Sequence, residues 1–148
     1  MKLRSVVAAF VAALFIVALS APQANAASSI QFRRIQYDSP GSDNRTNASL
    51  NAEYVVLKNV TTRNISITNW TVRDAANHVY KFGTFTLGAG KSVTLHTGKG
   101  TNSSTHRYWG SGNYVWNNTG DTATLKTPSG TTAYTCKWTS VGSGYKNC

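Results

Sequence analysis

Short runs of alternating apolar and polar residues fill the chain from about residue 30 onward, and turn residues separate them at intervals of about ten. A period of two predicts β-strands, and this spacing is typical of a β-sandwich or barrel. No stretch repeats apolar residues at helical spacing over a useful length. We expect eight or nine strands in two packed antiparallel sheets, because two facing layers bury one side of every strand.

The run 54–58 gives the clearest strand, with Val55 and Leu57 on one face and Tyr54 and Val56 on the other. Two apolar faces predict a central strand. The parity of the apolar positions changes within the runs 30–37 and 65–73, so we expect a bulge at Arg33–Arg34 and an irregularity near Thr68–Asn69. The segment 39–51 is predicted as a loop. Three side chains are expected in the core: Trp70, Trp116 and Leu125.

The N-terminus has the pattern of a cleavable signal peptide helix over residues 1–26. Lys2 and Arg4 precede an apolar run over 6–19, and Ala24-Asn25-Ala26 provides a small-x-small cleavage site. The run is shorter than the roughly 20 residues needed to span a bilayer. An N-terminal membrane anchor is the alternative. Because the apolar run is short and a cleavage site follows it, we predict a secreted, extracellular protein without a stable membrane anchor. Its domain would occupy residues 27–138.

Both cysteines lie near the C-terminus, at Cys136 and Cys148. An even number of cysteines in an exported chain predicts one disulfide, which would tie down the Gly/Ser-rich tail over 139–148. Two free thiols are the alternative. Metal binding is weaker still, because no histidine pair lies nearby.

The chain is strongly basic, with 15 Lys+Arg against 5 Asp+Glu and a formal net charge of +10. At 41% hydrophobic and 11% aromatic residues, it is too apolar for a disordered basic tail. The basic residues are dispersed. Such a charge attracts DNA, anionic wall polymers and membrane surfaces non-specifically, or it serves solubility alone.

Catalytic signals are weak, so we predict no enzyme, no cofactor and no metal. The three histidines match no zinc signature, no Gly-x-Ser-x-Gly elbow occurs, and the four aspartates sit in or beside separate turns or loops. A calcium site would need several oxygens at one point. The single glutamate, Glu53, is expected to hold a loop or an arginine. A small hydrolase is the least favoured class.

A basic aromatic segment is the best candidate for binding. Around Gly110–Asn113 the chain places Arg107, Tyr108, Trp109 and Tyr114. Exposed aromatic rings beside a loop can stack on sugars or bases. The alternative is that these rings pack over the open edge of the sandwich.

Several ordered motifs resemble the lamin tail domain family. They are Glu-Tyr-Val-x-Leu-x-Asn within 51–59, the apolar-x-apolar-x-x-Trp pattern within 65–74, Phe-x-Leu-x-x-Gly within 85–95, and Trp-Asn-Asn-x-Gly-Asp at 116–121. The resemblance implies an immunoglobulin-like antiparallel β-sandwich and an exported, actinobacterial-type, single-domain member. In animal lamins the domain binds proteins and, weakly, DNA. For stand-alone bacterial versions the resemblance implies no settled ligand.

Together these patterns predict a secreted, monomeric, non-catalytic binding module. Its partner would be a protein, a wall polysaccharide or a polyanion. The alternative is an extracellular nucleic-acid or polyanion binder driven by the basic surface, and weak non-specific binding of nucleic acid is expected in either case.

Overall fold

The computed structural model describes residues 28–148. The predicted signal peptide therefore lies outside the described residues. Within 28–148 the chain forms eleven strands and one short helix. That helix is not long and apolar enough to cross a membrane.

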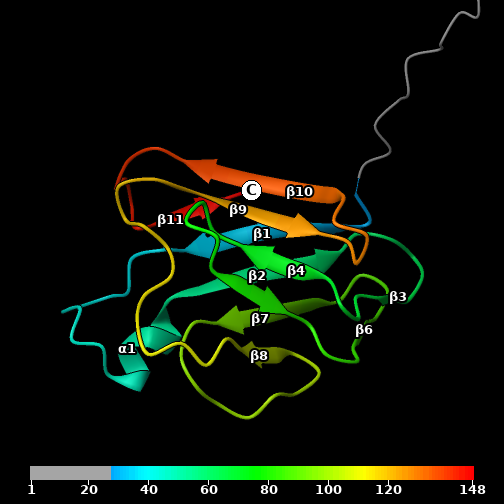
Figure 1. Cartoon of the computed structure of the whole chain (residues 1–148), viewed down its shortest axis with the longest axis horizontal. Helices are drawn as coiled ribbons and strands as arrows, with labels where there is room; N and C mark the ends of the chain where they lie inside the picture. The colour runs from blue at the N-terminus through cyan, green and yellow to red at the C-terminus, as the bar shows by residue number, and fades with distance from the viewer. Residues whose placement is uncertain (1–27) are drawn as a thin grey trace, which may run out of the picture.

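The strands form two main sheets, which lie one over the other in Figure 1. The five-stranded sheet has the order β11 (Tyr145–Asn147), β1 (Ile30–Gln36), β2 (Tyr54–Asn59), β7 (Ser92–His96), β8 (His106–Tyr108). The four-stranded sheet has the order β10 (Thr132–Trp138), β9 (Asp121–Lys126), β4 (Thr71–Arg73), β5 (Val79–Lys81). A third, two-stranded sheet pairs β3 (Ile65–Ser66) with β6 (Thr86–Leu87).

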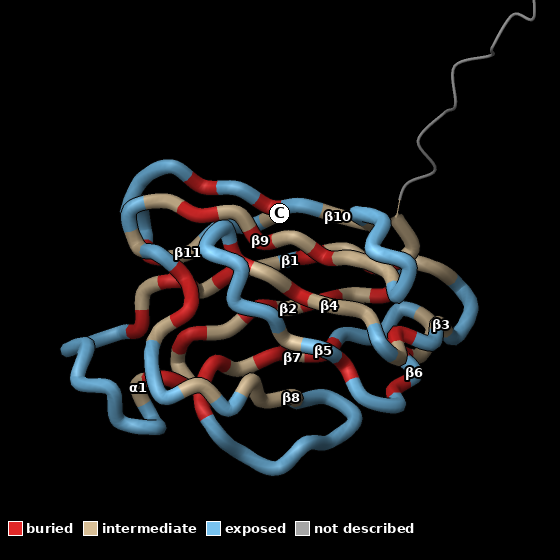
Figure 2. The backbone as a smooth tube through the Cα atoms, in the orientation of Figure 1, coloured by how far each residue is buried: buried red, intermediate tan, exposed pale blue. Residues whose placement is uncertain are grey.

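The core fills the space between the two main sheets. Inward side chains such as Ile35, Val55 and Leu95 from one sheet, and Val72 and Leu125 from the other, are almost completely buried. Buried and partly exposed positions alternate along the longer strands, as Figure 2 shows. The predicted immunoglobulin-like β-sandwich is confirmed. One strand pair, β7–β8, is parallel, whereas we expected antiparallel pairing alone.

Both predicted irregularities are present. The register of β1 on β2 shifts between Phe32 and Arg34, which is the expected bulge. At the second position the run 65–73 divides into β3 and β4, which belong to different sheets. Asn69 makes this division possible with a φ of 63°, a conformation that asparagine tolerates better than most residues.

One of the three predicted core residues is only partly buried. Trp116 and Leu125 are buried, as expected, but Trp70 is half-buried and packs against the core from its rim. Trp70 directly follows the turn at Asn69 and precedes β4, so it lies where the chain passes from one sheet to another, and its side chain is only partly buried against the core.

The predicted loop 39–51 contains a helix, α1 (Asn47–Ala52). Thr46 caps it by accepting a hydrogen bond from the Ser49 N–H at 3.3 Å. Leu50 is the helix's only buried residue. A helix of six residues is too short to show an apolar stripe, which explains why the sequence pattern does not reveal it.

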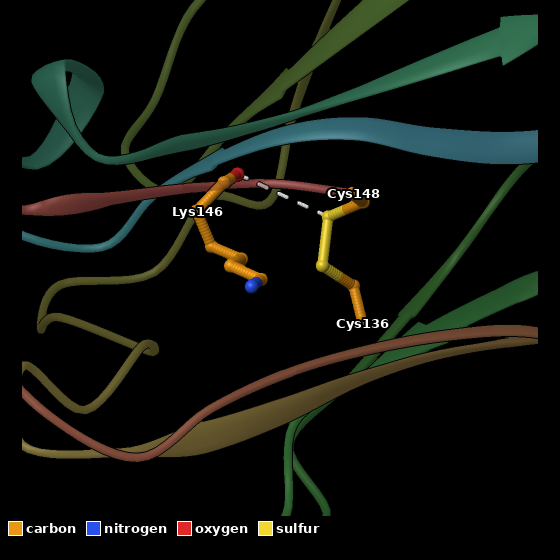
Figure 3. Close-up of a disulfide and its surroundings, with 3 residues drawn as sticks. All are labelled: Cys136, Lys146 and Cys148. Carbon is orange, nitrogen blue, oxygen red and sulfur yellow. Dashed lines mark hydrogen bonds between the residues drawn. A yellow bond between two sulfur atoms is a disulfide. The ribbon is translucent and has the colours of Figure 1, made fainter.

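The predicted disulfide is present and links the two main sheets. Cys136 lies on β10, and Cys148 directly follows β11 (Figure 3). The tail that it closes contains a strand that the sequence analysis did not predict. Its last residues form β11, which pairs with β1 over three residues.

We predict that the double variant C136A/C148A unfolds more easily than the oxidised protein. Closing a loop of 12 residues restricts the unfolded chain by about 3 kcal/mol in the entropy model. Urea unfolding at 25 °C should show a loss of this size. The wild-type protein with excess reductant is the matched control and should unfold at the same urea concentration as the variant. An unchanged midpoint in both would contradict a stabilising role.

Candidate functional site: the outer face of the five-stranded sheet

Planar side chains form one continuous row across the outer face of the five-stranded sheet. The row runs through directly paired positions on all five strands, in the order Tyr145, Gln36, Tyr54, His96 and Tyr108. All five side chains are partly exposed. On the three central strands the neighbouring residues Ile35, Val55 and Leu95 are buried, so the pleat turns this row outward, and the pairing carries the same orientation to β11 and β8.

A second row runs beside the first, two residues along each strand. It holds Asn147, Arg34, Val56, Thr94 and His106. The Arg34 guanidinium lies over the Tyr145 ring, 3.8 Å from its centroid, and donates a hydrogen bond to the Gln36 side chain at 2.9 Å. Neither row contains an acidic residue. The two rows form a surface of aromatic rings and cationic or neutral polar groups, which we call the outer face.

His96 is held in place from three sides. Its ring stacks on Tyr108 with centroids 5.0 Å apart and contacts Tyr54 at 5.9 Å. Its Nδ1 lies 2.8 Å from the backbone carbonyl oxygen of Asn51, at the end of α1. Burial lowers the pKa of His96, and the nearby His106 contributes in the same direction, so the ring is neutral near pH 7.

The loop after β7 supports one end of the outer face. The Tyr108 ring lies on Gly100, where a Cβ atom would come within 2.4 Å of two ring carbons. Asn47 and Asn51 of α1 each donate a side-chain hydrogen bond to the Lys99 carbonyl oxygen at 2.9 Å. The helix that the sequence did not reveal therefore holds the loop on which Tyr108 rests.

The outer side of the four-stranded sheet is chemically different. Its outward positions carry small hydroxyl side chains, Lys and Arg, with Val79 as an exposed apolar residue. They comprise Thr71, Arg73, Val79, Lys81, Thr122, Thr124, Lys126, Thr135 and Lys137. No aromatic side chain is among them, so the two faces of the sandwich share positive charge but not rings.

The structure does not bring the four predicted binding residues together. Tyr108 lies on the outer face. Arg107 and Trp109 have the opposite parity: the Arg107 guanidinium lies 4.0 Å from the Phe85 ring centroid, and Trp109 packs edge-on against Trp116 at 6.0 Å. These two side chains cover the open edge of the sandwich, the alternative considered from the sequence.

Tyr114 lies elsewhere, at the end of the sandwich beside α1. Its hydroxyl is 2.6 Å from the Ser49 hydroxyl. It lines a hollow of about 260 Å³ together with Asp43, Trp116, Asn117, Asn118 and Thr119. This hollow is separate from the rows of the outer face.

Glu53 is completely buried and holds the segment that carries Tyr114. Its Oε1 accepts hydrogen bonds from the Thr97 hydroxyl at 2.6 Å and from the Val115 N–H at 2.8 Å, and Oε2 accepts from the Trp116 N–H at 3.4 Å. Burial raises the pKa of Glu53 to about 7, although these three hydrogen bonds act in the opposite direction. As predicted, Glu53 fixes a loop; the partner is backbone and hydroxyl rather than an arginine.

The histidines within residues 28–148 form no Ser–His–Asp arrangement. His78 pairs with Asp74 at 2.5 Å between Nδ1 and Oδ2, but no hydroxyl is hydrogen-bonded to a histidine ring in this part of the chain. No three His, Cys, Asp or Glu side chains there lie close enough to share a metal ion.

Comparison with known families shows to which family the chain belongs. A lamin tail domain model matches residues 23–140, most of the chain. The chain belongs to the lamin tail domain family. This family has an immunoglobulin-like β-sandwich and consists of binding and interaction domains that are not known as enzymes. No curated protein matches the chain. In this lamin tail domain, β11 and Cys148 lie beyond the matched residues.

Sequence reasoning missed most of the outer face. It placed Tyr54 and Val56 on a second apolar face of a central strand. Both residues belong to the outer face, so this was the one signal of that surface in the sequence. It missed Arg34, His96, His106 and Tyr145 as a group, because their proximity depends on strand order and register, which alternation along one strand cannot give.

We predict that the buried carboxyl of Glu53 makes stability depend on pH. The folded protein holds this proton up to a pH of about 7 and the unfolded chain only to about 4.5, so the free energy of unfolding falls as pH rises through this window. The raised pKa corresponds to at most about 3 kcal/mol. Urea unfolding of the wild type and Glu53→Gln at pH 4, 5.5 and 8 measures it.

The difference between the two proteins isolates this contribution from that of the other carboxyl groups. Glu53→Gln keeps an acceptor oxygen for Thr97 and Val115, so the wild type should lose stability relative to the variant as the pH rises. Parallel pH profiles for the two proteins would show that the Glu53 pKa is not raised. Glu53→Ala, which leaves the two N–H groups unpaired, should be destabilised at every pH.

Proposed function

We propose that this lamin tail domain is exported and works outside the cell as a monomeric, non-catalytic binding module whose binding surface is the outer face. The apolar run over 6–19 with its small-x-small motif supports export, and so does the disulfide, since such bonds persist in oxidising compartments. The family supports an interaction module in general.

The observation that carries the proposal is the row from Tyr145 to Tyr108. It crosses five adjacent strands, so at roughly 4.8 Å per strand it extends about 19 Å. Aromatic rings of this kind stack on sugar rings and on bases without demanding a particular sequence. A rigid sheet fixes their spacing, which lowers the entropy lost on binding. An extended polymer, a wall polysaccharide in particular, fits such a row.

The acids of the chain support a non-catalytic role. Glu53 is fully buried, and Asp121 accepts three backbone hydrogen bonds, from Ala75, Asn117 and Thr122. Asp74 is buried and pairs with His78. A general acid or base must reach the substrate, and these three carboxyl groups are committed to the fold.

Charge supports a second candidate, binding of nucleic acid or another polyanion. Of the five acids only Asp38 and Asp43 are not buried, whereas none of the Lys and Arg side chains within residues 28–148 is buried. The accessible surface is therefore more positive than the sequence suggests. Such binding would involve both faces, since Lys58 lies on one and Lys81 on the other.

The aromatic row can be tested with Tyr54→Thr, which removes the ring and places a β-branched residue with high strand propensity at this position. The matched control is Val79→Thr on the opposite outer side. Pull-down with insoluble wall polysaccharide should show binding that survives 0.5 M salt, weakens at least about tenfold in Tyr54→Thr, and is unchanged in Val79→Thr. Equal affinities for all three proteins would remove the outer face as the binding surface.

A second pair of variants separates stacking from charge. We compare Lys58→Ala on the outer face with Lys81→Ala on the other sheet, using a single-stranded oligo(dT) and heparin at low and high salt. A non-specific polyanion binder loses affinity equally in both variants and steeply with salt. Binding that responds to Lys58 alone places even an anionic ligand on the outer face. Salt-dependent binding with equal losses would favour the second candidate instead.

A further inference from the structure

Two histidines from adjacent strands face each other on the outer face. β7 and β8 are parallel, with Thr94 paired to His106 and His96 paired to Tyr108, so His96 and His106 are diagonal neighbours. Their ring centroids are 5.2 Å apart, and His96 Nε2 lies 3.0 Å from His106 Nδ1. Ten residues separate the two in sequence, which is why no metal-binding motif shows in the chain.

The hydrogen bonds define which nitrogen of His96 is free to act as a ligand. The Asn51 carbonyl can only accept, so His96 Nδ1 carries the proton that it shares at 2.8 Å. In the neutral ring Nε2 then presents a lone pair toward His106. Histidines that bind metals are commonly oriented in this way, by a backbone carbonyl on the other ring nitrogen.

We propose that His96 Nε2 and His106 Nδ1 together bind one divalent copper ion. A metal–nitrogen distance of roughly 2.0–2.1 Å with 3.0 Å between the nitrogens gives an angle of about 95° at the metal. This is close to the right angle of adjacent ligands in tetragonal Cu²⁺ sites and well below a tetrahedral angle. Cu²⁺ also has the highest affinity of the first-row divalent ions for nitrogen ligands.

Binding needs only a local rearrangement. In the free protein the Nδ1–H group of His106 donates a hydrogen bond to His96 Nε2. With copper bound, the proton of His106 sits on its other ring nitrogen, Nε2, which faces solvent. No net proton is therefore released. His106 is exposed and can turn to aim its lone pair, whereas His96 is fixed between Tyr54 and Tyr108. The other coordination positions of the ion remain open to water or to a donor atom of a bound partner.

This inference does not rest on the proposed function. It requires the His96–His106 geometry alone, and it stands or falls whether or not the outer face binds a polymer. The fixed orientation of the His96 ring supports it, since the Asn51 carbonyl and the two tyrosine rings hold Nε2 toward His106.

The test is a Cu²⁺ titration of the purified, untagged, oxidised protein, with glycine as a competing ligand, followed by calorimetry and electron paramagnetic resonance. We expect one equivalent of copper with two imidazole nitrogens in its equatorial plane. His106→Ala should weaken binding at least about tenfold and leave one nitrogen, since even an outer-shell partner contributes that much. Zn²⁺ should bind more weakly than Cu²⁺.

The third histidine provides the matched control. His78 is 59% exposed and paired with Asp74. Since it lies beside β5 of the other sheet, His78→Ala should leave copper affinity and the resonance spectrum unchanged. The proposal is wrong if the wild type binds no copper, if His106→Ala binds as tightly as the wild type, or if His78→Ala loses as much affinity as His106→Ala. Because His106 is exposed, its replacement leaves the fold intact, and circular dichroism checks this.

Discussion

The alternation of buried and exposed side chains, locked in register across five strands, is the constraint on which the other features depend. Ile35, Val55 and Leu95 occupy one transverse row and are buried against the second sheet. Their neighbours Gln36, Tyr54 and His96 must then point outward together. A slip of one residue in any strand would exchange the two sets, exposing core residues and burying polar ones. The hydrophobic effect on the inner side thus aligns the rings on the outer side.

A second constraint acts at the end of the sandwich, where hydrogen bonds replace apolar packing. Glu53 lies between α1 and β2 and reaches the loop residues Val115 and Trp116. The same end is closed by α1, which holds the loop after β7 through Asn47 and Asn51. A buried carboxyl with several donors is strongly directional, so it fixes loops that have few apolar side chains.

Much of the fold was predictable because it depends on local patterns. Alternation gave the strands, a change of parity located the bulge between Phe32 and Arg34, and the cysteine count gave the disulfide. The errors have local causes too. Trp70 was expected between the sheets, but the left-handed conformation of Asn69 moves it to the rim. Helix α1 was missed because six residues stabilised by a cap and tertiary contacts leave no periodic signal.

The candidate site was far less predictable, and the reason is topological. Arg107, Tyr108 and Trp109 are adjacent in sequence, yet alternation sends Tyr108 to the outer face and its neighbours to the sandwich edge. Conversely, Tyr145 and Tyr108 belong to one row although 37 residues separate them (145 − 108). Proximity in the chain suggested one patch, whereas strand order brings a different set of side chains together. The parallel pairing of β8, which brings His106 to His96, has no signature along the sequence.

The C-terminal strand β11 has a consequence for how the molecule meets its neighbours. It pairs with residues 34–36 of β1, whose backbone N–H and C=O groups would otherwise be a template for pairing with another copy. What replaces that template is a three-residue border strand with Lys146 at its centre, too short and too charged to recruit a partner strand. The bond to Cys136 ties this border strand to the opposite sheet, so the disulfide and the pairing with β1 together keep the edge closed.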